Sequence, residues 1–203
     1  AGLGQERMSL RVEPLTGDAL RAALPALARL RIAVFRDFPY LYDGTLDYEQ
    51  RYLEKFAGAQ GSIIVVARDA GEIVGASTGA PMLEHADEFA APFRAKGHDL
   101  AKIFYFGESV LLASHRGRGI GHSFFDHREA RARSLGGFTH TAFCAVVRPS
   151  DHPLRPVHYQ PLDGFWGKRG YAKVEGLIAG FTWKDIDQPA PDEKPMQLWM
   201  REL

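Results

Sequence analysis

The feature that most constrains this chain is a glycine-rich segment at residues 116–121, Arg-Gly-Arg-Gly-Ile-Gly. The apolar run before it, residues 103–112, predicts a strand, and residues 122–135 have the spacing of a helix. Glycine at every second position permits a tight turn that exposes several backbone N–H groups. They would lie beside the free N–H groups of the helix start, which carries about half a positive charge. The segment predicts a phosphate or pyrophosphate site.

The spacing of the glycines separates this segment from two commoner phosphate loops. The loop that binds nucleoside triphosphates needs a lysine directly after its last glycine, and His122 stands there instead. The dinucleotide fingerprint needs a third glycine at that same position. The hexapeptide alone also leaves open a glycine-rich turn that binds no ligand.

Charge composition indicates a small anionic ligand rather than a polyanion. The chain has 25 basic and 25 acidic residues, which argues against a general nucleic-acid or membrane-surface binder. Positive charge is instead local, in and just after the glycine-rich segment: Arg116, Arg118, Arg128, Arg131 and Arg133. The alternative for the last three is a solvated helix face.

The rest of the composition indicates a cytoplasmic enzyme-sized domain without metal. A single cysteine, Cys144, excludes an intramolecular disulfide and favours a reducing, cytoplasmic setting. No apolar run approaches the ~20 residues that span a bilayer. No histidine has cysteines or carboxylates at the spacing of metal ligands, so no metal site is expected. Residues 1–7 show no pattern and are interpreted as a tag or a disordered N-terminus, and residues 8–203 are expected to form one domain.

Hydrophobic periodicity predicts one mixed sheet with flanking helices, an α/β (α+β) chain. Strands are predicted at residues 9–14, 62–69, 72–80, 103–112, 139–147, 177–183 and 196–200. Helices are predicted at residues 19–36, 47–57, 83–97, 122–135 and 165–169. Pro25 is expected to split or kink the first helix. The proline-rich stretch 148–164 is long for a loop, which is typical of functional segments.

Three segments together resemble the GNAT superfamily of N-acetyltransferases. Residues 116–121 fit its coenzyme A loop, [Q/R]-x-x-G-x-[G/A], and residues 106–113 (Phe-Gly-Glu-Ser-Val-Leu-Leu-Ala) look like its fourth strand. Residues 165–171 (Phe-Trp-Gly-Lys-Arg-Gly-Tyr) are similar to its Y-x-K-x-G-F segment. The resemblance runs from Leu10 to the final strand and implies a mostly antiparallel central sheet flanked by helices.

The resemblance also implies how acetyl-CoA would bind, in an opening between the fourth and fifth strands. Backbone groups of Val110, Leu111 and Leu112 would pair with the pantetheine arm. The pyrophosphate would be held by the loop and the helix start: Arg116, Gly117, Arg118, Gly119, Ile120, Gly121, His122 and Ser123.

Glu108 is the candidate general base. A free amine with a pKa near ~10 is protonated at neutral pH and must lose its proton before it attacks. Glu108 lies in an apolar strand segment, where burial disfavours the charged carboxylate. Its position resembles the glutamate base of the histone-type members, whose strand reads F-A-E-x-V. The alternatives are a solvent-facing carboxylate and one that binds a cationic substrate without taking its proton.

The general acid is not in its usual place. Many family members have a tyrosine four residues before the G-F pair, and here Trp166 precedes Gly170-Tyr171. An indole N–H is a poor proton donor to a leaving group. Tyr159 is a candidate substitute, although it could be a packing residue, and a thiolate could also leave unprotonated.

The leading hypothesis is an N-acyltransferase that moves an acetyl group from acetyl-CoA to a small-molecule amine by direct attack in a ternary complex. The acceptor wall is expected from aromatic residues: Phe38, Tyr40, Tyr42 and Trp166. A non-catalytic acyl-CoA sensor on the same fold is the alternative that the missing tyrosine favours, and a dinucleotide-binding domain is a third. No nucleic-acid or membrane partner is expected, and both a monomer and a homodimer fit the sequence.

Overall fold

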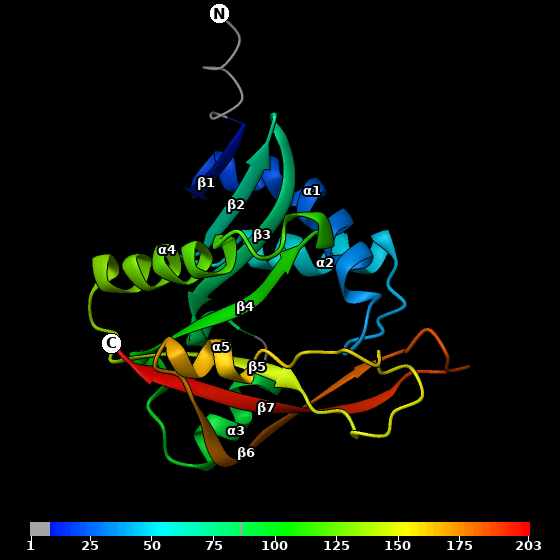
Figure 1. The fold of residues 1–203 in the computed structure, drawn as a ribbon. Coiled ribbons are helices and arrows are strands. Elements are labelled where there is room, and N and C mark those ends of the chain that lie inside the picture. Colours follow the sequence, from blue (N-terminus) through cyan, green and yellow to red (C-terminus); the bar gives the residue numbers. More distant parts are fainter. Residues whose placement is uncertain (1–8, 86) are drawn as a thin grey trace, which may run out of the picture.

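The computed structural model describes residues 9–85 and 87–203 and gathers the strands into one twisted sheet (Figure 1). Residues 1–7, interpreted from the sequence as a tag or a disordered N-terminus, lie outside the described residues. Within the described ranges, no helix is both long enough and apolar enough to cross a membrane.

The sheet has the order β1-β2-β3-β4-β5-β7-β6. Neighbouring strands are antiparallel except β4 and β5, which run parallel, so the expected mixed, mostly antiparallel sheet is confirmed. The strands are β1 (Leu10–Leu15), β2 (Ile63–Asp69), β3 (Glu72–Pro81), β4 (Ile103–Leu111), β5 (His140–Val146), β6 (Ala172–Trp183) and β7 (Asp192–Glu202).

Helices cover both faces of the sheet, which gives three layers (Figure 1). α4 and α5 lie over one face, and α1, α2 and α3 over the other. The helices are α1 (Gly17–Phe35), α2 (Leu46–Ala57), α3 (Asp87–Ala95), α4 (Ile120–Leu135) and α5 (Asp163–Lys168), with short 3-10 turns η2 (Met82–Glu84), η3 (Leu100–Lys102) and η4 (Ala113–His115).

Pro25 lies inside a continuous α1, so of the two effects that the sequence predicted, a split or a kink, the split is wrong. A proline inside a helix costs about 3 kcal/mol through a lost hydrogen bond and a steric clash. Leu20 lies before Pro25 and Leu27 after it, and both are buried against the sheet. Each buried leucine contributes about 1.5–3 kcal/mol, so packing on both sides of the proline offsets the local cost.

β4 and β5 diverge soon after they begin, which opens the sheet between them. They pair only from Ile103↔His140 to Tyr105↔Ala142. Beyond this point β4 continues with β3 up to Leu111, whereas β5 continues with β7 up to Val146. Among the described residues, the later part of β4 therefore has no neighbouring strand on its β5 side, as the resemblance implied.

A β-bulge reverses the facing of side chains along β4. Gly107 and Glu108 together oppose the single residue Thr78 of β3. Phe106 packs with the cluster under α4, yet Val110 packs with the cluster under α1 and α2. Regular alternation would put these two even-numbered side chains on one face, so the extra residue turns Glu108 towards α1.

Candidate active site

The loop between β4 and α4 has the geometry of an anion site. Gly117 and Gly119 have φ of +77° and +79°, and a Cβ at either would meet nothing within 4 Å. In the described part of the chain, none of the backbone N–H groups of residues 117–122 donates to an acceptor; Ser123 N–H is the first that does, to Gly119 O at 3.2 Å. These free donors converge at the start of α4, as binding of a pyrophosphate requires.

The side chain of His122 is exposed and contacts α5 and the residue after it. Its Nδ1 lies 3.2 Å from Arg169 Nη1, and its ring packs on Phe165 with centroids 4.6 Å apart. Arg116 and Arg118 are exposed, so their guanidinium groups are accessible to an anion.

Only one of the three residues expected to pair with pantetheine presents its backbone to the opening. Leu112 N–H donates to Val74 O of β3 at 3.0 Å. Because backbone groups alternate in direction along an antiparallel strand, those of Val110 also point to β3, while those of Leu111 point to the β5 side. The expectation of three consecutive contacts is therefore narrowed to Leu111, with Val110 buried in the core.

Glu108 is buried beside a cation rather than in apolar surroundings. Its side chain is 3% exposed, and Arg31 Nη1 of α1 lies 3.0 Å from its Oε1. Arg31 Nε also binds Glu49 of α2 at 2.5 Å. The ion pair is not aligned as a hydrogen bond, and neither oxygen of Glu108 has a hydrogen-bond partner among the described residues. Buried carboxylates are ordinarily satisfied, so this one is available to a donor from a ligand.

Electrostatics keeps the groups around Glu108 in defined protonation states. Burial by itself would lower the pKa of Arg31, but the carboxylates of Glu108 and Glu49 outweigh it and the pKa is raised. Burial, and then the charge of Glu108, raise the pKa of Tyr52. Arg31 therefore stays charged and Tyr52 stays protonated at neutral pH.

Arg128 holds the bulge in place, a role that the sequence analysis missed. It is 1% exposed, and its Nη1 donates to Thr78 O and Glu108 O, both at 3.2 Å. Burial lowers its pKa to about 10, so it remains a cation at neutral pH. Neither a phosphate ligand nor a solvated helix face is correct for this residue. Its spacing of four from the buried Phe124 and Ala132 is the signal that could have shown it.

The loop at residues 37–43, which follows α1, brings aromatic residues near the charged group of Arg31, Glu49 and Glu108. Phe38 packs edge-on against Tyr159 at 4.8 Å, and Tyr42 Oη donates to Glu49 Oε1 at 2.9 Å. Tyr40 packs on Phe35 with ring centroids 4.7 Å apart. Burial raises the pKa of Tyr159, which keeps the phenol protonated as an acid must be.

Trp166 lies apart from these residues, which corrects the expectation of a single aromatic wall. It belongs to α5 and packs on Phe143 and Trp199, at 4.9 and 5.1 Å between ring centroids. Those residues form the core under α4 and α5, whereas Tyr40 packs with Trp183 in the core on the other face. Trp166 therefore stabilises the sheet rather than the acceptor wall.

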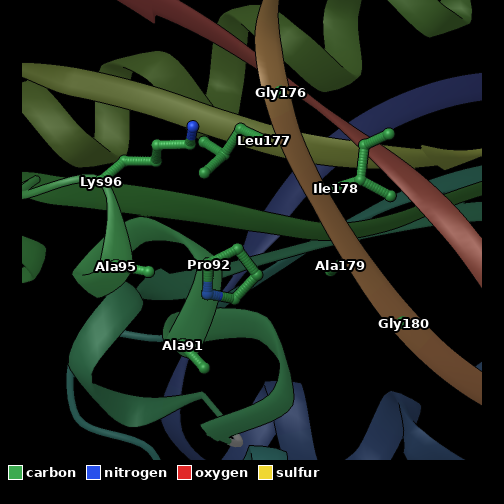
Figure 2. Close-up of a pocket in the computed structure, with 9 residues that line it drawn as sticks. All are labelled: Ala91, Pro92, Ala95, Lys96, Gly176, Leu177, Ile178, Ala179 and Gly180. Atoms are coloured by element: carbon green, nitrogen blue, oxygen red, sulfur yellow. The ribbon is translucent and has the colours of Figure 1, made fainter.

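A groove of about 450 Å³ between α3 and β6 has no catalytic chemistry (Figure 2). Among the described residues that line it, Lys96 alone has an ionisable side chain: Ala91, Pro92, Ala95, Lys96, Gly176, Leu177, Ile178, Ala179 and Gly180. The candidate active site is therefore the region between Glu108 and the start of α4.

Residues 27–163 match the acetyltransferase (GNAT) family. The chain belongs to this family. A ribosomal-protein-alanine N-acetyltransferase from Brucella melitensis is similar in structure, with TM-score 0.61, 14% identity, and coverage of 95% of this chain and 99% of that chain. The yncA protein of Salmonella typhimurium, solved with its cofactor acetyl-CoA, has TM-score 0.57, 11% identity, and coverage of 95% and 94%. No curated protein matches the sequence significantly.

At these identities the structural likeness shows the GNAT fold alone. Family membership supports acetyl-CoA-dependent acetyl transfer by this protein.

Proposed function

We propose that this GNAT protein transfers an acetyl group from acetyl-CoA to the amine of a small molecule, by direct attack within a ternary complex. The observation that carries the proposal is Glu108, on the strand that borders the β4–β5 opening: its buried carboxylate has no hydrogen-bond donor among the residues that the structure describes. An amine that enters from this opening would supply the missing donor. The single cysteine fits action in the cytoplasm.

The residues present fit acetyl-CoA at the other end of the site. The free N–H groups of residues 117–122 would hold its pyrophosphate, with Arg116 and Arg118 adding charge and Ser123 a hydroxyl. Leu111 would supply its backbone N–H to the pantetheine arm, while its carbonyl accepts from Arg116 Nη2 at 3.5 Å. When bound, acetyl-CoA supplies an acetyl group activated as a thioester.

Glu108 would accept the proton of the attacking amine, a contribution typically worth about 10²–10⁴-fold in rate. Arg31 fixes the carboxylate in place through their ion pair. Phe38, Tyr40 and Tyr42 would wall the acceptor.

Tyr159 would return a proton to the departing thiolate, because its phenol stays protonated at neutral pH.

The direct test of activity is thiol release from acetyl-CoA with a panel of amines: tyramine, spermidine, lysine and a short peptide with N-terminal alanine. A small amine is expected to be acetylated faster than the peptide. Faster acetylation of the peptide would overturn the small-molecule assignment.

The direct test of the loop is Gly119→Val, measured by calorimetric titration with coenzyme A. A β-branched residue at φ +79° is strained and would reshape the free N–H groups, so binding should be lost. Gly136→Val is the matched control, since Gly136 has φ +76° at the other end of α4. Equal affinity in both variants would exclude the loop as the pyrophosphate site.

An acyl-CoA sensor is the second candidate, because Trp166 stands where a catalytic tyrosine is usual and packs in the core. Tight binding of acetyl-CoA without thiol release across the whole panel would favour the sensor over the enzyme.

A further inference from the structure

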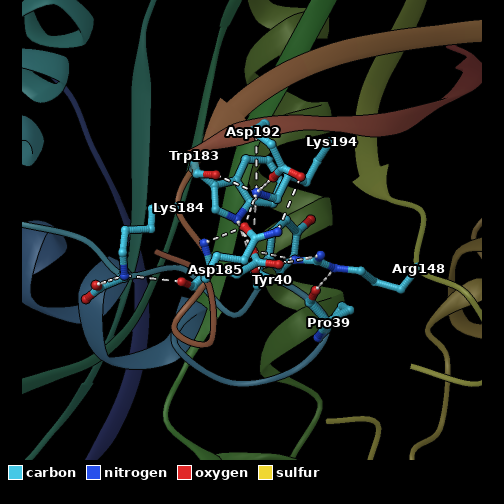
Figure 3. Close-up of polar contacts among 10 residues, drawn as sticks. Pro39, Tyr40, Arg148, Trp183, Lys184, Asp185, Asp192 and Lys194 are labelled. Atoms are coloured by element: carbon cyan, nitrogen blue, oxygen red, sulfur yellow. Dashed lines mark hydrogen bonds and ion pairs between the residues drawn. The ribbon is translucent and has the colours of Figure 1, made fainter. Parts of the chain in front are cut away.

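The loop at residues 37–43 is fastened by a buried ion pair that the proposed chemistry does not use (Figure 3). Arg148 follows β5, and its Nη1 and Nη2 bind the two carboxylate oxygens of Asp185 at 2.7 and 2.9 Å. The same guanidinium donates to Pro39 O and to Tyr40 O, both at 2.7 Å. The side chain of Arg148 is 9% exposed and that of Asp185 is 2% exposed. One arginine thus joins the loop to the β6–β7 turn.

Further donors complete this arrangement around Asp185. Trp183 Nε1 lies 3.0 Å from both Tyr40 O and Asp185 Oδ1 and donates to them. Lys194 Nζ lies 3.6 Å from Asp185 Oδ1. A bidentate arginine contact fixes direction as well as distance, so the backbone of the loop has little freedom here.

The loop also contains a strained residue that needs such support. Leu41 has φ +55° and is 2% exposed. This conformation is an outlier for a bulky residue and persists only where the surroundings enforce it. Ile186 N–H, next to Asp185, donates to Leu41 O at 2.8 Å, and Asp43 N–H donates to Lys184 O at 3.0 Å. The β6–β7 turn thus holds Leu41 in this conformation.

A continuous polar path joins this loop to the candidate base. Tyr42 Oη donates to Glu49 at 2.9 Å, and Glu49 binds Arg31 at 2.5 Å. Arg31 in turn lies 3.0 Å from Glu108. A shift of the loop at Tyr42 would therefore reach the carboxylate through two intervening side chains.

We propose that Arg148 and Asp185 are positioning residues for the acceptor half of the reaction. They hold the loop so that Phe38 and Tyr40 face the acceptor while Tyr42 keeps Arg31 against Glu108. This inference rests on the proposed function, because it assigns the loop to the acceptor site. It separates the acceptor half from the proposed pyrophosphate site, the loop at residues 116–121 that follows β4.

The test variant is Arg148→Lys, which keeps the charge but loses the fork of donors. The first measurement needs no ligand: hydrogen exchange of the Asp43 and Ile186 amides should speed up. The second is kinetic, with the amine from the panel above that gives the fastest thiol release. Its kcat/KM should fall about 10- to 100-fold, as expected for a misplaced substrate, while the KM for acetyl-CoA stays unchanged.

Two further variants separate positioning from a general loss of stability. Trp183→Phe removes only the indole donor and should give a smaller change of the same kind. This variant replaces Arg148→Lys in the test if Arg148→Lys does not fold. Glu129→Gln is the control, since Glu129 is equally buried and binds Arg169 and Arg201 on the other face. It should lower stability without changing the acceptor KM relative to that for acetyl-CoA.

The outcomes are distinct. Unchanged hydrogen exchange in both Arg148→Lys and Trp183→Phe would overturn the proposal that Arg148 and Asp185 hold the loop at residues 37–43. Two results would overturn the positioning role. One is faster hydrogen exchange with an unchanged kcat/KM for the acceptor. The other is an equal loss of kcat/KM for the acceptor and for acetyl-CoA. If the wild-type protein acetylates no amine, the proposed function fails, whereas hydrogen exchange still decides whether the ion pair holds the loop.

Discussion

Two buried ion clusters meet the same loop, and they differ in how completely their carboxylates are satisfied. Around Asp185, the donors of Arg148 and Trp183 bind both oxygens. Around Glu108, the described residues supply one ion pair, in which Arg31 lies close to one oxygen without hydrogen-bond alignment. A buried carboxylate whose two oxygens are hydrogen-bonded, like that of Asp185, fixes a conformation. A buried carboxylate without such bonds, like that of Glu108, still needs a donor.

The comparison indicates which cluster serves structure and which serves chemistry. Leaving a buried acceptor without a donor costs about 1–3 kcal/mol. Proteins retain such a cost where activity requires it. The incomplete cluster is therefore the place where a ligand is expected to complete the hydrogen bonding.

Glu108→Gln tests the incomplete cluster and should have the largest effect. Because an amide cannot accept a proton from the amine, turnover should fall about 10²–10⁴-fold near neutral pH. Affinity for acetyl-CoA and the urea midpoint should remain close to those of the wild type. Turnover equal to the wild type would exclude Glu108 as the base.

Asp185→Asn tests the complete cluster and should show the opposite pattern. Loss of one buried partner leaves Arg148 and Lys194 without a full counter-charge, which typically costs 3–5 kcal/mol, so we expect a loss of about that size in the free energy of unfolding. Urea denaturation measures it. A loss as small as that of Glu108→Gln would remove the distinction between the clusters.

His85 sharpens the comparison, because it gives an acid sensitivity that belongs to neither cluster. Burial lowers its pKa from 6.5 to about 4. Between these values the unfolded chain binds a proton that the folded chain does not, so stability is full above about pH 6.5 and falls as the pH drops to about 4. The total loss is about 3 kcal/mol.

Urea titrations across this pH range should show the slope in the wild type and lose it in His85→Phe. A slope that survives the substitution would have to come from carboxylates, including those of the two clusters.

Tyr42→Phe tests the link between the clusters and should have the smallest effect. It removes one hydrogen bond to the buried Glu49, so we expect a loss of about 1–3 kcal/mol in stability. Thermal unfolding and acceptor kinetics would measure it. Tyr48→Phe is the control, because Tyr48 is 49% exposed and should change neither. Equal effects of the two substitutions would show that the path through Glu49 does not matter.

Local patterns in the sequence predicted the order of the elements and the backbone conformation of the proposed anion-binding loop. Apolar periodicity reports which face of a strand or helix is buried, and glycine reports the backbone conformation of its own position. Residues 103–112 and 122–135 were therefore placed within a residue or two of β4 and α4. The loop between them shows the free N–H groups that its glycines predicted.

The acceptor half depends on contacts between residues far apart in the chain, which local patterns do not report. The surroundings of Glu108 were expected to be apolar because its ion-pair partner Arg31 lies on α1, far away in the sequence. Trp166 was placed in the acceptor wall because its position in α5 does not reveal which face of the sheet α5 covers. Pro25 was given too much weight because local propensity competes with packing on both sides of it.

The bulge at Gly107 means that the backbone conformation of β4, and not only its residues, determines where the acid lies. A Cβ at Gly107 would stand 2.6 Å from Thr78 Oγ1, so the extra residue fits only as glycine in this arrangement. If the same residues alternated regularly without the bulge, Glu108 would lie on the face of Phe106, in the aromatic core under α4 beside Phe106 and Phe125. The bulge therefore puts the charge on the α1 side of the sheet without altering any functional side chain.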